Sequence, residues 1–367
     1  MNKLGPFHTV LLFGGAGFIG SNWAYRLLKT TDAKIHIFDN LSRRGVHQNL
    51  HWLQQEAMDS DRLKITIGDV RDASLVRRAV QSAAEIYHFA AQVAVTRSVE
   101  DPRSDFEVNV GGTLNILEAA RSSGRQPSLL FTSTNKVYGR LISRPWRVTS
   151  TAYDGEDNGV DEAQPLDFYS PYGCSKGAAD QYVHDYHRMF GLPTVVFRMS
   201  CIAGARQFGN EDQGWVAHFL YSALQGRPVT LYGNGRQVRD ILCVDDLVHA
   251  FERVRSHAAT TAGQIYNVGG GVENAVSLLD IIDGIEALTG KRLGFSTADT
   301  RPGDQLFYVT NSSRLRDHTG WEPRIKVRET LERIYEWWRA NQSSVSPVRF
   351  GSHTRAQTLE PVPGAAS

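Results

Sequence analysis

The sequence predicts an α/β fold, in which a doubly wound parallel sheet carries helices on both faces and a smaller C-terminal lobe is interleaved with it. Two observations predict this class. Short apolar and β-branched runs alternate with amphipathic stretches between residues 9 and 200, and strands that alternate with helices form βαβ units. From about residue 201 the elements become shorter and glycines more frequent, which favours an interleaved lobe over a separate domain behind a clean linker.

Apolar, β-branched runs mark the strands, and stretches with an apolar residue at every third or fourth position mark the helices. Residues 140–169 are rich in Pro, Gly, Asp and Thr, so they break this rhythm and predict a long loop. The predicted strands are residues 9–14, 34–39, 62–69, 85–91, 128–134 and 193–200. The predicted helices are residues 18–29, 106–123, 171–190 and 327–342.

The composition excludes several classes of protein. With 40 basic and 39 acidic residues among 367, the formal net charge is +1, far from the basic excess of a nucleic-acid-binding protein. No apolar run approaches the ~18 residues of a membrane span, and the N-terminus lacks a signal-peptide pattern. Cys174, Cys201 and Cys243 fit neither a disulfide framework nor a metal site. We therefore expect a cytoplasmic protein without a metal, a membrane partner or a nucleic-acid partner.

The stretch FGGAGFIGSN follows the first predicted strand and opens the first predicted helix. Gly14, Gly17 and Gly20 have a spacing that permits a tight turn and a close approach of the backbone to a pyrophosphate. Asp39 ends the next strand, where an acid binds the ribose hydroxyls and disfavours a 2′-phosphate. The combination predicts a Rossmann-type domain that binds NAD, and binds it tightly.

Two details of cofactor binding stay open at this stage. Arg43 and Arg44 follow Asp39 closely, and arginine can accommodate the 2′-phosphate of NADP. Asp69, at the end of the third predicted strand, either meets the adenine or caps the helix that follows.

The stretch SPYGCSK, residues 170–176, places Tyr172 and Lys176 four residues apart behind a Ser-Pro pair. Ser170 is a favourable N-cap and Pro171 a favourable first helical residue, so the phenol and the amine share one helix face. A phenol with a pKa of ~10 needs help to act as a base at neutral pH. We expect the Lys176 ammonium and a nicotinium ring to lower the pKa of Tyr172. Alone the pair also fits a solvated helix face, but beside the glycine turn it predicts hydride transfer to or from an alcohol.

The stretch FTSTNKVYG ends the strand at 128–134, at the sheet edge where ligands bind in such folds. Thr132, Ser133 and Thr134 alternate in the direction that they face. One of these hydroxyls can hold the reacting oxygen, although each also fits a capping role.

Together these motifs resemble those of the extended short-chain dehydrogenase/reductases, in the branch of NAD-dependent nucleotide-sugar epimerases and dehydratases. GGAGFIG, FDNLS, GDVRD, HFAAQ, NVGGTLNILEAA, STNKVYG, YGCSK, VRD with VDDL, and RPGD occur in the family's order between about residues 8 and 340. Within the family, the stretches FDNLSRRGVHQNLHWL, TSTNKVYG, LDFYSPYGCSKGAADQY and RQFGNEDQGWV most resemble the enzymes that convert CDP-paratose to CDP-tyvelose.

The resemblance implies a role for each matched residue. Thr134 would be the hydroxyl partner, Tyr172 the acid/base and Lys176 the ribose-bound lysine. Trp215 and Tyr232 would contact the substrate, although both also fit the core, and Arg239 and Arg301 would grip its diphosphate instead of forming surface ion pairs. The cofactor would contact Gly14, Gly17, Phe18, Ile19, Gly20, Asp39, Asn40, Ser42, Arg43, Asp69, Val70, Ala90, Ala91, Gln92, Asn109, Thr132, Tyr172, Lys176 and Ser200. The substrate would contact Asn135, Lys136, Cys201, Gln207, Trp215, Val216, Tyr232, Arg239, Arg301 and Tyr308.

The resemblance implies an isomerase that inverts C2 of a CDP-3,6-dideoxyhexose, or of a related nucleotide hexose, through a transient keto sugar in deoxysugar and lipopolysaccharide biosynthesis. The main alternative is a UDP-sugar 4-epimerase. A non-catalytic NAD(H)-binding sensor or scaffold is a further alternative, but it would not need Tyr172, Lys176 and Thr134 together. The family's 4,6-dehydratases carry Thr-Asp-Glu where this chain has Thr134, Asn135 and Lys136, so dehydration is disfavoured.

We expect residues 1–200 to form the NAD-binding domain, with residues 238–268 returning to it. Residues 201–342 would form most of the substrate-binding lobe, and residues 343–367 a disordered tail. The resemblance implies a homodimer, in which the 106–123 helix and the helix that carries Tyr172 form a four-helix interface.

Overall fold

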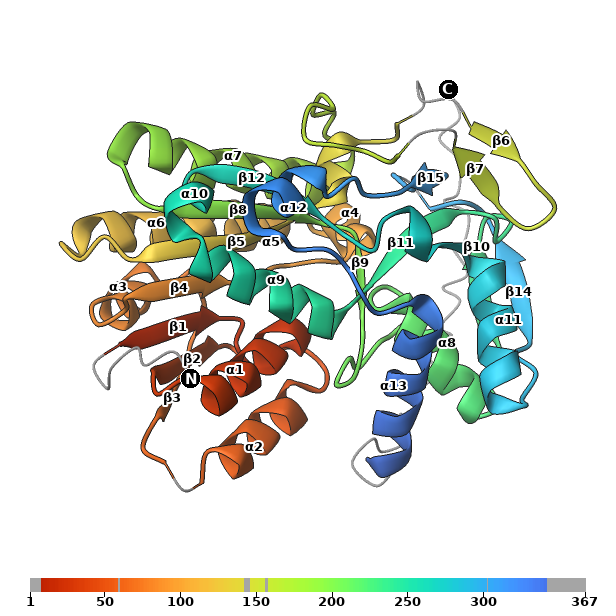
Figure 1. The fold of residues 1–367 in the computed structure, drawn as a ribbon, viewed down its shortest axis with the longest axis horizontal. Coiled ribbons are helices and arrows are strands. Elements are labelled where there is room, and N and C mark those ends of the chain that lie inside the picture. Colours follow the sequence, from red (N-terminus) through yellow and green to blue (C-terminus); the bar gives the residue numbers. More distant parts are fainter. Residues whose placement is uncertain (1–7, 59, 142–145, 156–157, 302, 342–367) are drawn as a thin grey trace, which may run out of the picture.

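The computed structural model describes residues 8–58, 60–141, 146–155, 158–301 and 303–341, so the predicted tail at 343–367 lies outside the described residues. At its centre is a seven-stranded parallel sheet with the order β12-β8-β5-β4-β1-β2-β3 (Figure 1). The predicted doubly wound sheet is confirmed. Its strands are β1 Thr9–Phe13, β2 Lys34–Asp39, β3 Leu63–Ile67, β4 Glu85–His88, β5 Ser128–Thr134, β8 Thr194–Met199 and β12 Gln264–Val268.

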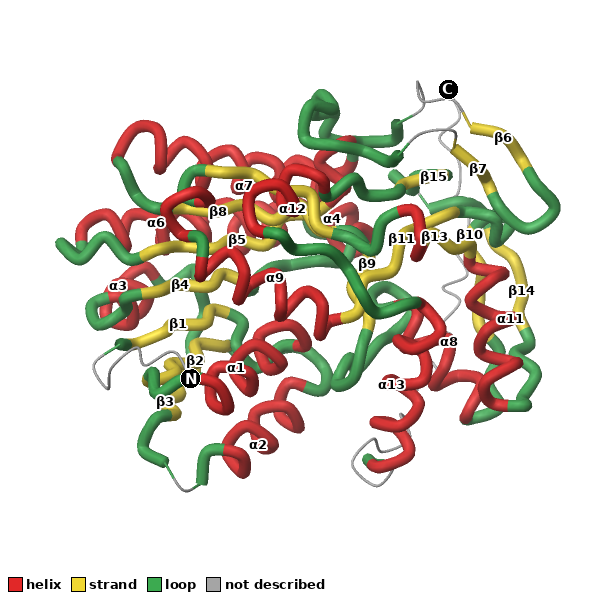
Figure 2. Tube along the Cα trace, viewed as in Figure 1, coloured by secondary structure: helices red, strands yellow, loops and turns green. Residues whose placement is uncertain are grey.

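The central strands form because their side chains are buried on both faces. In β1, Val10 and Leu12 face one core while Leu11 and Phe13 face the other, as the period of two along a strand requires. Helices cover each face of the sheet (Figure 2). The first face packs against α1 Phe18–Thr30, α2 Val46–Glu56 and α9 Val244–Ser256. The second packs against α3 Ala73–Val80, α6 Gly112–Ser122 and α7 Ser170–Phe190.

The strand order places a crevice at the carboxyl end of β1. The chain runs outward from β1 to β2 and β3, and then returns to pair β4 on the other side of β1. Connections that leave in opposite directions open a crevice at this reversal, which is where open parallel sheets bind ligands. The glycine turn at 14–20 lies at this point.

Two predicted segments differ from the structure. The helix expected at 106–123 is divided into α5 Pro102–Phe106, a π-helical turn at Glu107–Gly111 and α6. A π-helical turn often marks a functional site. The loop expected at 140–169 contains a short antiparallel hairpin of β6 Trp146–Val148 and β7 Tyr153–Gly155, because Arg147 of one strand pairs with Asp154 of the other. The helix α4 Val95–Glu100 and the 3-10 turn at Asn135–Tyr138 complete this half of the chain.

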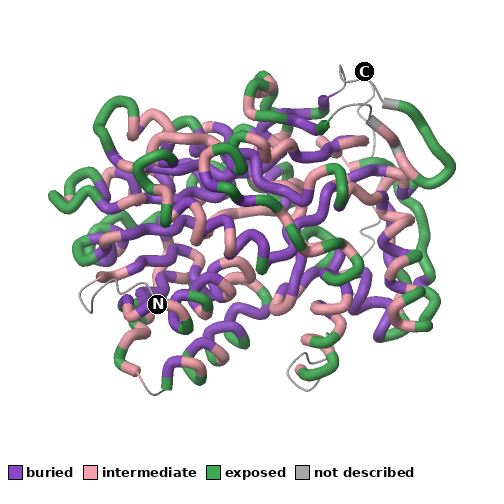
Figure 3. Tube along the Cα trace, viewed as in Figure 1, coloured by how far each residue is buried: buried purple, intermediate pink, exposed green. Residues whose placement is uncertain are grey.

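The second lobe has its own apolar core, and buried residues lie along its helices in Figure 3. That core packs α8 Trp215–Leu224, α11 Leu278–Thr289 and α13 Val327–Ala340 against strand β10 Val229–Tyr232. The exposed strand β14 Phe295–Ala298 pairs with β10. The remaining short elements are α10 Ala258–Thr261, α12 Ser313–Thr319 and the 3-10 turn at Val272–Asn274.

Residues 238–268 divide between the two halves. β11 Val238–Cys243 pairs with β9 Cys201–Ala203, β13 Ala275–Ser277 and β15 Phe307–Tyr308 in a small sheet. Later in this range, α9 packs on the main sheet and β12 pairs with it. In the part of the chain that the structure describes, no helix is long and apolar enough to cross a membrane.

Candidate active site

The glycine turn brings the backbone at Gly14 close to the backbone at Ala90 and at Gly20. Gly14 has a φ of +76° and donates from its amide to Phe38 O at 2.8 Å. A Cβ on Gly14 would lie 2.6 Å from Ala90 N, and one on Gly20 would overlap the carbonyl oxygen of Gly14. Gly17 caps the N-terminus of α1. Only glycine fits at 14 and 20, and the amide groups at the start of α1 therefore face the crevice, where they favour an anion.

A cavity of about 500 Å³ runs along this edge of the sheet. It extends from the glycine turn past the ends of β2, β3 and β4 to Tyr172 and Lys176 of α7. Its size and its lining suit a dinucleotide. Of the residues predicted for the cofactor, it is lined by Gly14, Gly17, Phe18, Ile19, Gly20, Asp39, Asn40, Ser42, Arg43, Asp69, Val70, Ala90, Ala91, Gln92, Thr132, Tyr172 and Lys176.

The two acids at the adenosine end have different environments. The Asp39 carboxylate accepts from Ala16 N at 3.0 Å and from Leu41 N at 2.9 Å, and burial raises its pKa. Asp69 accepts from the Asn40 amide at 2.9 Å and from the Arg71 guanidinium, which holds the pKa of Asp69 well below its usual range. Asp72, not Asp69, caps α3, so the capping interpretation of Asp69 is wrong.

The catalytic candidates meet at the end of β5. The Thr134 hydroxyl lies near the phenol of Tyr172 and opposes the burial that raises the pKa of Tyr172. The Thr134 oxygen accepts from Lys136 N at 3.3 Å, so Thr134 also caps the 3-10 turn that follows β5. Lys176 donates from Nζ to Thr132 O at 2.7 Å and lies 4.0 Å from the ring centre of Phe131.

The start of α7 is held under strain. Ser170 has a φ of +76°, which is rare for a residue other than glycine. Its Oγ accepts from Gly173 N at 3.2 Å, and Tyr172 N donates to Ser98 Oγ of α4 at 3.1 Å. The helix therefore begins with its side-chain and main-chain partners fixed, as is common where a reactive group must be positioned.

The expected electrostatics of the pair are wrong in one respect. Burial raises the pKa of Tyr172 to about 12, and the groups that oppose this are the Thr134 hydroxyl and Arg43. Burial also lowers the pKa of Lys176 to about 7, against the nearby carboxylates of Asp180 and Asp105. Lys176 therefore does not supply the main charge that favours the phenolate, because its own ammonium is destabilised by the same desolvation.

Asn109 lies behind the cavity. It is 1% exposed, and its Oδ1 accepts from Gln92 N at 2.9 Å while its Nδ2 donates to Gln92 O at 3.0 Å. Asn109 does not itself line the cavity in this structure, and its contact with the cofactor stays a prediction. Asn109 instead fixes Gln92, which does line the cavity.

The segment 207–214 bridges the two halves of the molecule beside the cavity. Arg43 donates to Gln213 Oε1 at 3.1 Å and to Ala91 O at 3.2 Å, and Thr96 donates to Asp212 Oδ1 at 3.0 Å. From the second lobe, Arg301 pairs with Asp212 at 3.3 Å. Of the residues predicted for the substrate, Gln207 of this segment lines the cavity.

A charged cluster lies behind the end of β5. Asp304 accepts from Arg239 at 2.7 Å and from Lys136 Nζ at 3.3 Å, and the Asn135 amide donates to Gln305 Oε1 at 3.2 Å. Burial lowers the pKa of Lys136 to about 8, although Asp304 opposes this. Arg239 is thus already paired with Asp304. It could bind a diphosphate only if it also kept or released this carboxylate.

Four other residues predicted for the substrate lie in two pairs, Arg301 with Tyr232 and Trp215 with Cys201. Arg301 lies 3.8 Å from the ring centre of Tyr232, whose hydroxyl donates to Glu211 at 2.7 Å. Trp215 hydrogen-bonds the thiol of Cys201 and packs edge-on against Phe219. These side chains keep some exposure at the face of the second lobe.

Two residues predicted for the substrate and one predicted for the cofactor lie outside the lining of the cavity. Val216 is 1% exposed in the core of the second lobe, and Tyr308 is fully buried and stacked on Tyr138. Their contacts with the substrate stay predictions. Ser200 donates to the main chain of Asp240 at 3.0 Å and does not line the cavity.

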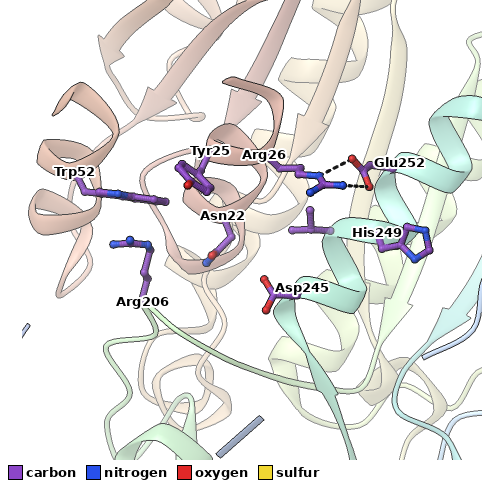
Figure 4. A pocket seen from close by; sticks show the side chains of 9 residues that line it. Asn22, Tyr25, Arg26, Trp52, Arg206, Asp245, His249 and Glu252 are labelled. Carbon is purple, nitrogen blue, oxygen red and sulfur yellow. Dashed lines mark hydrogen bonds and ion pairs between the residues drawn. The ribbon is translucent and has the colours of Figure 1, made fainter. Parts of the chain in front are cut away.

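A second cavity, of about 300 Å³, lies on the outer side of α1, between α2 and α9 (Figure 4). Arg206 stacks over Trp52 at 3.2 Å from the ring centre, and Arg26 pairs with Glu252. Arg206 lines both cavities, but the second one contains neither Tyr172 nor Thr134. Its charged groups lie away from the chemistry at α7.

Several residues that line the main cavity escaped the sequence analysis. Arg97, Ser104 and Val108 come from the helices before α6, and Phe208, Asn210 and Gln213 come from the bridging segment. No local spacing marks them, because loops and short helices bring them to the cavity over long sequence separations. The glycine-containing stretch QFGNEDQG was the available signal for the second group.

The chain is similar to known proteins over most of its length. The family model described as GDP-mannose 4,6 dehydratase matches residues 11–334. The chain is 40% identical over 338 residues to a CDP-paratose 2-epimerase from Salmonella typhi, covering 89% of this chain and 98% of that protein. A UDP-glucose 4-epimerase of Thermus thermophilus, solved in complex with NAD, superposes with a TM-score of 0.75 at 32% identity, covering 90% and 99% of the two chains. A dTDP-glucose 4,6-dehydratase of Streptomyces venezuelae, solved with NAD bound, gives a TM-score of 0.79 at 28% identity, covering 92% and 99%.

Proposed function

This chain belongs to the family described as GDP-mannose 4,6 dehydratase, and on that premise we propose that it is an NAD-dependent epimerase of nucleotide sugars. The observation that carries the proposal is the Thr134 hydroxyl near the phenol of Tyr172, which lines a dinucleotide-sized cavity. A phenol and a hydroxyl that both contact the oxygen of a substrate alcohol can take its proton while the carbon that bears this oxygen loses a hydride.

The residues present fit NAD. A side chain at Gly14 would collide with Ala90, so main chain lines the place of a pyrophosphate, and Asp39 favours free ribose hydroxyls over a 2′-phosphate. Lys176, near the inner end, would reach the nicotinamide ribose. When bound, the cofactor would accept a hydride and return it, and its positive ring would favour the phenolate of Tyr172 against the burial that raises its pKa. We propose that it is held tightly, because the bridging segment 207–214 is tied to both halves of the protein beside it.

The chain's own residues then handle the proton. The Tyr172 oxygen takes the proton of a ring hydroxyl while Thr134 hydrogen-bonds the same oxygen. Together with the loss of a hydride from the carbon, for which bound NAD would be the acceptor, this leaves a keto sugar. The keto sugar turns in the cavity and presents its other face. After the hydride returns to that face, Tyr172 gives back the proton, and the carbon is inverted.

Dehydration does not fit the residues at the end of β5. Loss of water needs an acid for the leaving hydroxyl and a base for the carbon-bound proton. Here Asn135 is a neutral amide bonded to Gln305, and Lys136 is bonded to Asp304. The family is described as a dehydratase, but this site lacks the acid and the base that dehydration needs.

We propose that the substrate is a CDP-3,6-dideoxyhexose inverted at C2, with CDP-paratose converted to CDP-tyvelose. The support is the 40% identity to the Salmonella typhi CDP-paratose 2-epimerase over nearly the whole of both chains. Arg301, stacked on Tyr232, and Arg239 would bind the diphosphate, which holds the nucleotide end still while the sugar turns.

The test is to offer CDP-paratose, CDP-glucose and UDP-glucose separately to the purified holoenzyme and to identify the product by NMR. Inversion of C2 in CDP-paratose supports the proposal. Inversion of C4 in UDP-glucose would instead assign the chain as a UDP-sugar 4-epimerase. If all three nucleotide sugars are recovered unchanged while NAD stays bound, the result would favour a non-catalytic, cofactor-binding sensor.

We also propose a homodimer through a four-helix interface, to which each chain contributes α7 and the helical segment 106–123. Large apolar side chains of these elements are exposed, with Phe106 57% and Phe190 47% exposed. Exposed apolar side chains that gather on one face commonly mark an interface. Sedimentation of the protein as a monomer would contradict this. A cytoplasmic location and a role in lipopolysaccharide biosynthesis belong to the same proposal, the first because all three cysteines are free thiols.

A further inference from the structure

A buried carboxylate that the proposed mechanism does not use lies directly behind the catalytic pair. Asp105 of α5 is 1% exposed. Its oxygens accept from Ser175 Oγ, from Gln92 Nε2 at 2.8 Å and from Asn109 Nδ2 at 3.3 Å. Burial raises the pKa of the Asp105 carboxyl, and its hydrogen bonds with Ser175 and Gln92 oppose this by favouring the charged form.

These partners come from three different parts of the site. Ser175 lies between Tyr172 and Lys176 on α7, Gln92 lines the cavity after β4, and Asn109 belongs to the π-helical turn. The Asn109 amide also donates to Ser175 Oγ at 3.0 Å. The network therefore ties the helix of the phenol, the cofactor side of the cavity and the π-helical turn to one buried charge.

Resting on the proposed function, we propose that Asp105 is a positioning residue, which holds α7 and the Gln92 loop in register so that Tyr172 faces the reacting oxygen. Buried, fully satisfied networks of this kind fix one geometry, and a partly satisfied one is costly. A displacement of the reacting groups by about 1 Å can cost about 100-fold in rate.

The charge of Asp105 also acts on the pair itself. It raises the pKa of Tyr172 and the pKa of Lys176. The other charged groups around the pair are Arg43, which lowers the pKa of Tyr172, and Asp180, which raises that of Lys176; His88 stays neutral because burial lowers its pKa. Removal of the Asp105 charge must therefore lower the pH at which Tyr172 ionises, a shift that a merely structural role would not require.

The experiment uses the holoenzyme with D105N, and with D185N as a control, since Asp185 is an exposed carboxylate on α7. We expect D105N to keep NAD, to lower kcat about 10-fold to 100-fold with a smaller change in KM, and to ionise Tyr172 at lower pH. That ionisation is followed as the phenolate absorbance that Y172F abolishes, so it is measured without any sugar. If no tested sugar is turned over, the proposed function fails while the phenolate titration still tests Asp105.

A wild-type ionisation pH together with a kcat within about twofold of wild type would overturn the proposal. If D105N does not fold, S175A decides. It removes the link between α5 and α7 but keeps the buried charge, so kcat should fall several-fold while the ionisation of Tyr172 stays in place. An unchanged kcat in S175A would then overturn the proposal.

Discussion

Lys176 donates from Nζ to the main-chain oxygen of Thr132 at 2.7 Å, so the lysine of α7 is anchored to strand β5. The same strand ends two residues later in Thr134, whose hydroxyl lies near the phenol of Tyr172. The bond from Lys176 therefore ties the helix to the strand beside the reacting centre. This attachment keeps the phenol and the hydroxyl close to each other, which proton transfer requires.

Tyr172→Phe should lower turnover by about 100-fold to 10 000-fold, because the ring remains but the proton-transferring oxygen is lost. NAD should remain bound, since the glycine cradle and Asp39 are unchanged. The measurements are the rate of epimerisation and the NAD content of the purified protein. Tyr182→Phe on the same helix is the control, because Tyr182 is 47% exposed. A wild-type rate in Tyr172→Phe would remove Tyr172 from the mechanism.

Asp39→Asn should weaken the binding of NAD by about tenfold and should reduce the preference for NAD over NADP. The single amide oxygen of Asn can accept a hydrogen bond from Ala16 N or from Leu41 N but not from both. The loss of one hydrogen bond to a charged group costs about 1.5–3 kcal/mol. Removal of the charge also removes the repulsion of a 2′-phosphate. Binding of both cofactors by calorimetry after removal of the resident one gives the ratio. Asp61→Asn is an exposed control. An unchanged ratio would separate Asp39 from cofactor choice.

Arg301→Lys should raise KM for the nucleotide sugar by about 30-fold, with kcat changed much less. Lysine keeps the charge but loses the stacked, planar contact with Tyr232 and one donor to a diphosphate, which corresponds to about 2 kcal/mol. Steady-state kinetics give both constants. Arg328→Lys, in an exposed pair with Glu332, is the matched control. A loss confined to kcat would contradict a role in binding.

His36 should make the protein less stable in mild acid. Burial lowers the pKa of His36 to about 4, while the unfolded chain takes up the proton near ~6.5. Between these values the unfolded state binds more protons, so stability falls as the pH falls through this window, by on the order of 3 kcal/mol.

Urea unfolding at about pH 7.5 and pH 4.5 should therefore show a smaller loss in His36→Gln than in the wild type. His51→Gln, at an exposed position on α2, should keep the wild-type loss. An equal loss in all three proteins would show that His36 is protonated while folded.

The part of the site made by local sequence was predictable. The turn at Gly14–Gly20 and the helix face of Tyr172 and Lys176 depend on backbone conformations within a few residues. The strand bounds at 34–39 and 128–134 match the predicted ones, because continuous apolar runs are what a buried parallel strand needs. Helix α7 begins at Ser170, next to the predicted start at Pro171.

The substrate side was less predictable because its residues meet only through folding. Tyr308 looked like a contact residue but stacks on Tyr138 in the core, more than 160 positions away. The pairing of Arg239 with Asp304 and that of Arg43 with Gln213 join distant segments. Nothing in the spacing around either residue carries that information.

By itself, the sequence determined a glycine turn, an acid at the end of β2 and a tyrosine and lysine on one helix face, since each depends on neighbours along the chain. The tertiary structure alone decided how those groups ionise. Burial sets the pKa of Tyr172 and of Lys176, and Asp105 reaches both from another helix. Desolvation and long-range charge depend on what packs around a group, and that is fixed only when distant segments come together.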